Sequence, residues 1–125
     1  MNEFDAIVLI GHGSNRAEAN ADVKRLCRLV RELREPPVRV EAAFLQFATP
    51  DVPAVVAALA RDGFRSIVLV PIFLYSGTHA GEDIPLLVET ERLRRPELTL
   101  TLAPPLGIDD RIAMMVWDRV EQAGR

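Results

Sequence analysis

The chain contains only two histidines, and each follows a compact apolar run that is typical of a buried strand. His12 comes after the run Ala6 to Ile10, and His79 comes after the run Ile67 to Val70. A neutral imidazole is a common ligand for zinc, copper, iron, nickel and cobalt. Two imidazoles that face one cleft can hold a divalent ion and leave coordination positions open. We therefore predict that both histidines lie in loops on the same side of a sheet and bind a metal ion.

Three interpretations fit the segment Gly11-His12-Gly13-Ser14. It lacks the spacing of the glycine-rich phosphate-binding fingerprints. Ser14 as a nucleophile of a small α/β hydrolase would need a base and an orienting acid, and the G-x-S-x-G order is absent. A tight turn that presents His12 needs nothing further, and we favour it. The alternative without a metal is that each histidine only hydrogen-bonds its own loop.

Polar side chains near the two histidines extend the candidate site. Gln46 ends the second predicted strand, and its neutral amide can hydrogen-bond a ligand but cannot take a proton at physiological pH. Glu82 stands three residues after His79, so one helical turn would put both side chains on the same side. We consider Glu82 a candidate auxiliary acid. The alternative is that Glu82 and Asp83 only stabilise the amino end of a helix, where the helix dipole is positive.

Apolar and aromatic residues cluster around the same strand ends. They would suit a flat, apolar ring system, although residues of this kind are more often part of a core. The residues are Leu45, Phe47, Phe73, Leu74 and Tyr75.

Strand-like apolar runs alternate with helical periodicity along the chain. The predicted strands are Ala6–Ile10, Val38–Phe44, Ile67–Val70 and Leu98–Leu102, and the predicted helices are Arg16–Arg34, Val52–Arg61, Ile84–Leu93 and one from Asp109 or Asp110 through Val120. The order βαβαβαβα implies an α/β fold with a four-stranded parallel sheet and helices on both faces. We expect one domain over residues 1–125.

Local signals fix several boundaries of these elements. Pro71 removes a backbone donor, so pairing of the third strand should end near it. Thr49-Pro50-Asp51 is a signal for the start of the second helix, and Gly63 suits the cap after its last turn. Pro85 suits the first turn of the third helix. The alternation of leucine with threonine in Leu98–Leu102 indicates a strand with one wetter face, which we place at the sheet edge.

Composition excludes several classes of protein. The formal net charge of −3 argues against general nucleic-acid binding. The single cysteine, Cys27, rules out an internal disulfide and a multi-cysteine metal site, and it falls in a helical pattern as a small buried hydrophobe. No run approaches transmembrane length, so we expect a cytoplasmic protein without a membrane partner.

Several short motifs occur in order over essentially the whole chain. They are Leu9–Ser14, Val40–Gln46, Thr49-Pro50 and the helix after it, Val70–Leu74, Gly77-Thr78-His79, Asp83-Ile84-Pro85 and Pro104–Gly107. With these motifs the chain resembles the short form of the CbiX/SirB-type sirohydrochlorin chelatases of the class II chelatase superfamily. Each motif is weak alone, and together they are fairly specific.

The resemblance implies a lyase that inserts a divalent metal into sirohydrochlorin during tetrapyrrole biosynthesis. In the family cobalt leads towards cobalamin, iron gives sirohaem and nickel leads towards coenzyme F430. The metal ion is a substrate, and no organic cofactor is needed. The family's metal-binding, catalytic histidines fall on His12 and His79, and the short forms act as homodimers. The tetrapyrrole would contact Ser14, Gln46, Phe47, Ser76, Gly77 and Thr78.

One position departs from the family pattern. The family usually has a glutamate where this chain has Gln46. Metal insertion releases two pyrrole protons, which a carboxylate beside the metal can accept. Either His12, His79 or Glu82 takes that role, or turnover is slowed. The alternative function is a carrier that binds metal or tetrapyrrole without inserting the metal.

Overall fold

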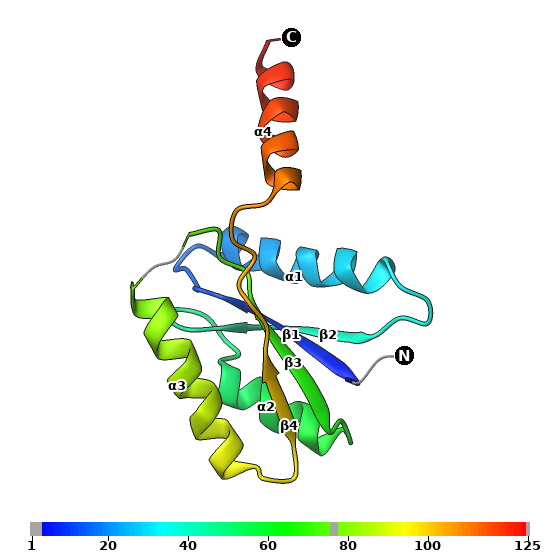
Figure 1. Ribbon diagram of the computed structural model, residues 1–125, viewed down its shortest axis with the longest axis vertical. Helices are drawn as coiled ribbons and strands as arrows, with labels where there is room; N and C mark the ends of the chain where they lie inside the picture. Colours follow the sequence, from blue (N-terminus) through cyan, green and yellow to red (C-terminus); the bar gives the residue numbers. More distant parts are fainter. Residues whose placement is uncertain (1–3, 76–77, 125) are drawn as a thin grey trace.

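The computed structural model describes residues 4–75 and 78–124, without the side chains of residues 78–81. Strands and helices alternate in the predicted order (Figure 1). The strands are β1 (Ala6–Gly11), β2 (Arg39–Phe44), β3 (Ser66–Pro71) and β4 (Thr99–Leu102). The helices are α1 (Ala17–Glu32), α2 (Val52–Arg61), α3 (Thr78–Arg94) and α4 (Asp110–Ala123).

All four strands are parallel and lie in the order β2-β1-β3-β4. The predicted α/β fold with a four-stranded parallel sheet is therefore confirmed, and β4 lies at an edge as expected. Ile10 pairs with Ala43 of β2 and with Pro71 of β3. The carboxyl ends of β1, β2 and β3 are thus level with one another, which brings the loops after them together.

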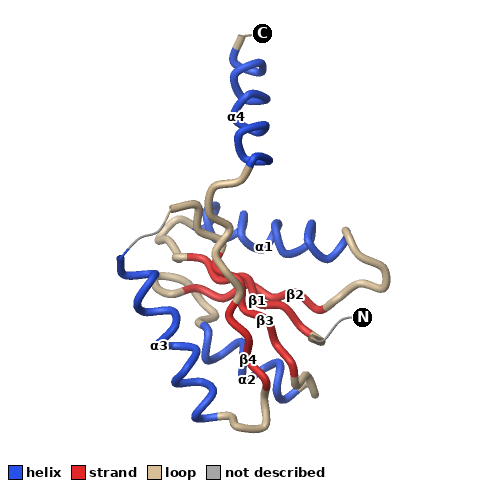
Figure 2. Tube along the Cα trace, in the orientation of Figure 1, coloured by secondary structure: helices blue, strands red, loops and turns tan. Residues whose placement is uncertain are grey.

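The two faces of the sheet build two apolar cores. Helix α1 lies on one face, and α2 and α3 lie on the other (Figure 2). Strand residues alternate between the faces, as the period of two requires. The α1 core is centred on Leu9, Cys27, Val40, Ala42 and Phe44. The core under α2 and α3 is larger and includes Val8, Ile10, Val56, Leu59, Ile67, Leu69, Ile84, Val88 and Leu100.

Helix α2 begins and ends at the predicted signals. The carboxylate of Asp51 accepts a hydrogen bond from the Ala54 N–H (3.0 Å), which satisfies a free donor of the first turn. At the other end Phe64 N–H donates to the carbonyl of Leu59, and Gly63 adopts a φ of 98°. This is the usual glycine-dependent helix end. The sequence signals therefore fix both ends of α2.

The prediction for the third helix was wrong at its start. Helix α3 begins at Thr78, so Pro85 lies inside it and not in its first turn. The proline removes one backbone hydrogen bond and disfavours helical structure before it. Ile84 and Val88 are nevertheless 2% and 1% exposed on the sheet side of the helix. Their burial offsets the lost bond, so packing prevails over the local signal.

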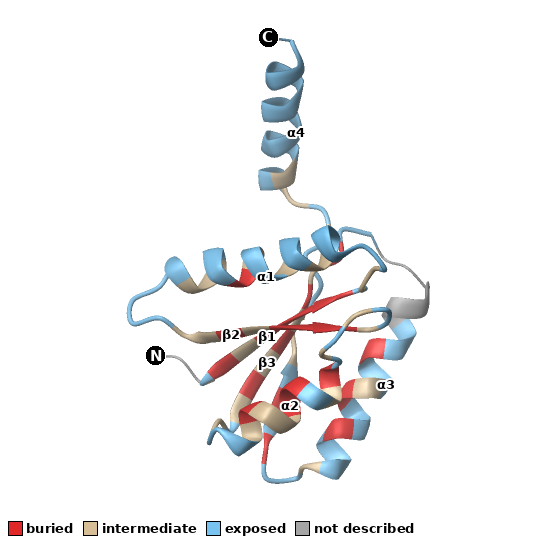
Figure 3. Cartoon of the chain, turned by 180° about the vertical axis from the view of Figure 1, so that it is seen from behind, coloured by how far each residue is buried: buried red, intermediate tan, exposed pale blue. Residues whose placement is uncertain are grey.

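Helix α4 stands apart from the sheet (Figures 1 and 3). Asp109 is its N-cap, because its carboxylate accepts a hydrogen bond from the Arg111 N–H (2.9 Å). The apolar face formed by Ile112, Met115, Val116 and Val120 exists as predicted, but no residue of α4 is buried. The structure therefore leaves this face without a partner inside the described chain.

Cys27 is buried at 4% exposure, as expected for a small hydrophobe. Burial, with a smaller effect from the Glu41 carboxylate, raises the pKa of its thiol to about 11. In the described ranges, no helix is both long and apolar enough to cross a lipid bilayer.

Candidate active site

Backbone pairing continues past the ends of the strands and holds the loops of the site together. The N–H of Gln46 donates to the carbonyl of His12 (3.1 Å), and that of Ile72 donates to the carbonyl of Ile10 (3.0 Å). The loop after β4 joins them, because Gly107 N–H donates to the carbonyl of Phe73 (3.0 Å). His12, Gln46 and Phe73 therefore lie at one end of the sheet, where parallel sheets bind ligands.

Gly13 forms the turn that presents His12. Its φ is 90°, a conformation that side chains disfavour. A Cβ on Gly13 would also lie only 1.7 Å from the backbone oxygen of Gln46. Only glycine fits between the loops after β1 and β2, so the structure agrees with the tight-turn interpretation of this segment.

The imidazole of His12 stacks on the ring of Phe73. The ring centroids are 3.9 Å apart and the planes are inclined by 23°. Phe73 is 8% exposed and belongs to the core under α2 and α3, so it is a fixed support. His12 itself is exposed. Within residues 4–75 and 78–124, its ring nitrogens make no hydrogen bond, which leaves them available to a ligand.

The second half of the predicted site is only partly covered by the structure. Ser76 and Gly77 lie outside the described residues, and so do the side chains of Thr78 and His79. The backbone at His79 belongs to α3, which corrects the prediction that it lies in a loop. Strands β1 and β3 are neighbours, so the segments that carry the two histidines follow adjacent strands. A shared metal site stays a prediction.

Acidic groups do not gather around His12 in the part of the chain that the structure describes. No cluster of three or more histidine, cysteine, aspartate or glutamate side chains occurs there. Glu82 is exposed and lies on α3, the helix that contains His79. His79 and Glu82 are thus three residues apart on one helix, as the auxiliary-acid hypothesis requires.

Ser14 and Asn20 fix the loop after Gly13. The Asn20 carboxamide accepts from the Ser14 N–H (3.0 Å) and donates to the Ser14 carbonyl (2.8 Å). The Ser14 hydroxyl accepts from the Arg16 N–H (3.0 Å). Sequence reasoning missed Asn20, although a poor helix former in the first turns of α1 was a signal. Ser14 has a local structural role here, and nothing in its contacts resembles a nucleophile.

The apolar residues of the predicted lining divide into two groups. Phe73 is buried, and Leu45 is half-buried against the same core. Phe47, Leu74 and Tyr75 are 65%, 39% and 79% exposed. Large exposed apolar side chains beside a conformationally fixed histidine are typical of a surface that a flat ligand covers.

A hollow of about 220 Å³ lies against His12. It is lined by Gly11, His12, Gly13, Ser14, Ala19, Asn20, Val23, Ile72 and Phe73. This is smaller than the ~300–1,000 Å³ that enclose a drug-sized ligand. This hollow alone is therefore too small to enclose a ligand of that size.

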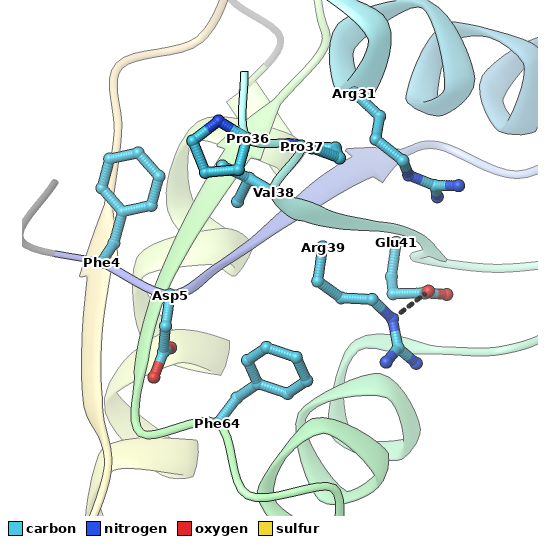
Figure 4. Close-up of a pocket in the computed structure, with 9 residues that line it drawn as sticks. All are labelled: Phe4, Asp5, Arg31, Pro36, Pro37, Val38, Arg39, Glu41 and Phe64. Carbon is cyan, nitrogen blue, oxygen red and sulfur yellow. Dashed lines mark hydrogen bonds and ion pairs between the residues drawn. The ribbon is translucent and has the colours of Figure 1, made fainter. Parts of the chain in front are cut away.

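A different hollow of about 580 Å³ opens at the amino ends of the strands (Figure 4). Phe4, Pro36 and Phe64 line it, and Arg39 there pairs with Glu41 at 2.7 Å. Arg39 also lies over the ring of Phe64, 5.5 Å from its centroid. Arg31 also lines this hollow; one of its Nη atoms donates to the carbonyl of Val40 (2.9 Å), but its buried Nε has no hydrogen-bond partner among the described residues. The hollow lies at the opposite end of the sheet from the end where parallel sheets usually bind ligands.

The fold and the site define a small parallel α/β protein with a histidine-bearing cleft at the strand ends. The family model for CbiX matches residues 6–123, and the chain belongs to the CbiX family. It is 32% identical to the sirohydrochlorin cobaltochelatase of Methanopyrus kandleri, over 94% of this chain and 96% of that protein.

Longer relatives match over about half of their length. The chain is 28% identical to the sirohydrochlorin ferrochelatase of Bacillus subtilis, over 95% of this chain and 45% of that protein. It superposes with a TM-score of 0.83 on the crystal structure of the sirohydrochlorin chelatase SirB from Bacillus subtilis subspecies spizizenii in complex with cobalt. That match has 27% identity and covers 94% of this chain and 50% of the other.

Proposed function

We propose that this protein inserts a divalent metal ion into sirohydrochlorin. The observation that carries the proposal is His12, held by a glycine turn and stacked on Phe73 at the carboxyl end of the sheet. Membership of the CbiX family and the names of the relatives support the same reaction. The enzyme is a lyase, and the metal ion is its substrate.

The tetrapyrrole lies across the strand ends with its ring against exposed apolar side chains. Phe47, Leu74 and Tyr75 supply this surface, whose burial under the ring contributes roughly 25 cal/mol per Å². We expect the peripheral carboxylates of the substrate to contact Ser14, Ser76, Gly77 and Thr78. The Ser14 hydroxyl can donate to a carboxylate while it accepts from Arg16.

His12 and His79 hold the incoming ion on one side of the ring. Stacking on Phe73 restricts the orientation of the His12 imidazole, so less entropy is lost when it binds the ion. As the ring nitrogens replace the water and imidazole ligands, two pyrrole protons leave. His12, His79 and Glu82 are the candidate acceptors, because the side-chain amide of Gln46 cannot take a proton.

Absorbance spectroscopy tests the proposed reaction. Purified protein is mixed with sirohydrochlorin and Co²⁺, Fe²⁺ or Ni²⁺ in parallel, and the spectrum of the metallated product is followed against protein-free controls. We expect acceleration with at least one ion, with cobalt the first choice because relatives that this chain matches over 96% and 99% of their length are named cobaltochelatases. Tight binding of metal or tetrapyrrole without acceleration would support the carrier function that Gln46 suggests.

We also infer that the working unit is a cytoplasmic homodimer. The match covers 96% of the cobaltochelatase of Methanopyrus kandleri but only 45% of the Bacillus subtilis ferrochelatase. Two copies of this chain together would have about the length of the Bacillus subtilis protein. Sedimentation of the purified protein tests the dimer, and fractionation of the source cells tests the location.

A further inference from the structure

A further hollow, of about 320 Å³, lies between the carboxyl end of α1 and the amino ends of β1 and β2. This α1 hollow adjoins the hollow of Figure 4, with which it shares Phe4, Arg31 and Val38. Six of its eight lining residues are apolar, the other two are Arg31 and Arg34, and none of the eight is acidic. Small-molecule sites usually have volumes of ~300–1,000 Å³ and a mostly apolar lining with a few polar groups. The α1 hollow therefore has the size and the lining of a small-molecule site.

The apolar wall of the α1 hollow belongs to the core under α1. Ile7 and Val30 pack against that core, and Val40, one of its central residues, is 1% exposed. Phe4 and Val38, which also line the hollow, are half-buried. Side chains held by a packed core keep their positions, so most of the wall is formed before a ligand arrives. A ligand that covers the wall removes apolar surface from water at little cost in side-chain ordering.

The guanidinium group of Arg31 is fixed beside this wall and has a donor without a partner. Its bond to the carbonyl of Val40 makes the side chain span from α1 to β2 (Figure 4). Its buried Nε has no hydrogen-bond partner, and no carboxylate of the described chain lies within ion-pair distance of it. Buried donors of this kind are rare in folded proteins. Arg31 therefore offers a positive charge to which the described chain supplies no counter-ion.

Arg34 adds a second unpaired cation to the α1 hollow. It follows the end of α1, it is exposed, and it makes no hydrogen bond or ion pair with any described residue. The acids of the adjoining hollow are already engaged. Asp5 accepts from two backbone N–H groups at the start of β3 (both 3.0 Å), and Glu41 pairs with Arg39. The carboxyl end of α1 contributes only about half a negative charge, so the lining of the α1 hollow keeps an excess of positive charge.

We propose that the α1 hollow is a second ligand site, which binds a small carboxylate with an apolar body. The apolar body lies against Ile7, Val30 and Val40, and the carboxylate accepts hydrogen bonds from the guanidinium groups of Arg31 and Arg34. A planar guanidinium group matches the geometry of a carboxylate and bonds it more strongly than a neutral donor does. The α1 hollow is at the opposite end of the sheet from the hollow at His12, so this site is separate from that of metal insertion.

The lining argues against other classes of ligand. A free metal cation would meet two guanidinium groups and no acid, since Glu32 and Glu35, the acids nearest to them in the sequence, do not line the hollow. A neutral apolar molecule would cover the wall but leave both cations without a counter-ion. A tetrapyrrole is larger than a hollow of about 320 Å³ can enclose. An apolar monocarboxylate matches both the wall and the two cations.

Nuclear magnetic resonance of the isotope-labelled full chain tests the proposal, with octanoate as the probe. We expect saturable shifts of the backbone amide signals of Ile7, Val38 and Val40, whereas those of Gly13 and Gly107, at the other end of the sheet, stay unchanged. Octanol has the same apolar chain without the charge, so it should bind at least about tenfold more weakly. The absence of a saturable shift at Val38 and Val40, or equal affinities for octanoate and octanol, would overturn the proposal.

Three variants separate the effect of charge from that of shape. Arg34→Gln removes one of the two cations and keeps the bond between Arg31 and Val40. Arg28→Gln is the matched control, because it removes the same charge from an exposed position of α1 that does not line the hollow. Val38→Phe places a larger side chain in the hollow and leaves both cations in place.

We expect Arg34→Gln to bind octanoate about tenfold more weakly, Arg28→Gln to bind it like the wild type, and Val38→Phe to lose binding. The amide spectrum of each variant shows whether it is folded, and Arg34 is exposed, so the comparison of Arg34→Gln with Arg28→Gln remains decisive if Val38→Phe does not fold. Equal affinities of Arg34→Gln and Arg28→Gln, or wild-type affinity of a folded Val38→Phe, would contradict the proposed site. The readout does not depend on metal insertion.

Discussion

Stacking on Phe73 and a backbone hydrogen bond to Gln46 hold His12 in place at the candidate site. His12 gains a fixed orientation from Phe73, a core residue, and its loop is held against Gln46 by a backbone hydrogen bond. Gln46, where the resemblance leads us to expect a glutamate, is therefore next to the proposed metal ligand in the backbone pairing. The two positions were predicted from sequence separately, but their contact depends on the register of β1 against β2.

Gln46→Glu tests whether the missing carboxylate limits the reaction. A carboxylate beside the metal accepts a pyrrole proton and partly offsets the charge of the ion, so the initial rate of metal insertion should rise by up to about 10²-fold. Gln46→Met is the matched control, because it keeps the length of the side chain without an acid. Equal rates for the two variants would show that protons leave by another group.

Gly13→Ala tests the turn that presents His12. Both Gly13 and Gly63 have positive φ, at 90° and 98°, but a Cβ on Gly63 meets nothing within 4 Å. Strain alone costs on the order of 1–2 kcal/mol at either position. Gly13→Ala adds a clash with the Gln46 carbonyl, so it should lower the free energy of unfolding more than Gly63→Ala in urea titrations and also weaken metal binding. The opposite ranking would contradict the described packing of the two loops.

Helices and strands were predictable to the extent that local signals agreed with packing. Asp51 and Gly63 gave the ends of α2, and the leucine–threonine alternation placed β4 at the edge. Pro85 was misleading, because the burial of Ile84 and Val88 keeps the helix continuous around it. Asn20 was missed, because its role depends on where the Ser14 loop returns to the start of α1.

The packing of α1 makes a prediction about pH. Burial raises the pKa of the Cys27 thiol from 9.0 to about 11. Between these pH values the folded chain holds a proton that the unfolded chain releases, so stability falls as the pH rises. The loss should reach about 2–3 kcal/mol near pH 11. This loss is measured by urea unfolding of the wild type and of Cys27→Ala at a series of pH values from 8 upward. If the free energy of unfolding falls with pH equally in Cys27→Ala, the loss does not come from the Cys27 thiol.

At the scale of the whole molecule, α4 is the one helix of the described chain without a buried residue. The sequence predicted the apolar face of α4 correctly, but it could not show that nothing in the same copy covers it. This feature depends on how distant parts of the chain pack, which a local sequence pattern does not determine.

The central claim is that His12 and His79 act on one metal ion that enters sirohydrochlorin. The most direct measurement is the initial rate of cobalt insertion by the wild type, His12→Ala, His79→Ala and the double variant, with circular dichroism to confirm folding. Ligands of a shared ion act as a unit, so each single variant should lose most of the acceleration and the double variant little more. A single variant that inserts cobalt at the wild-type rate would contradict the account.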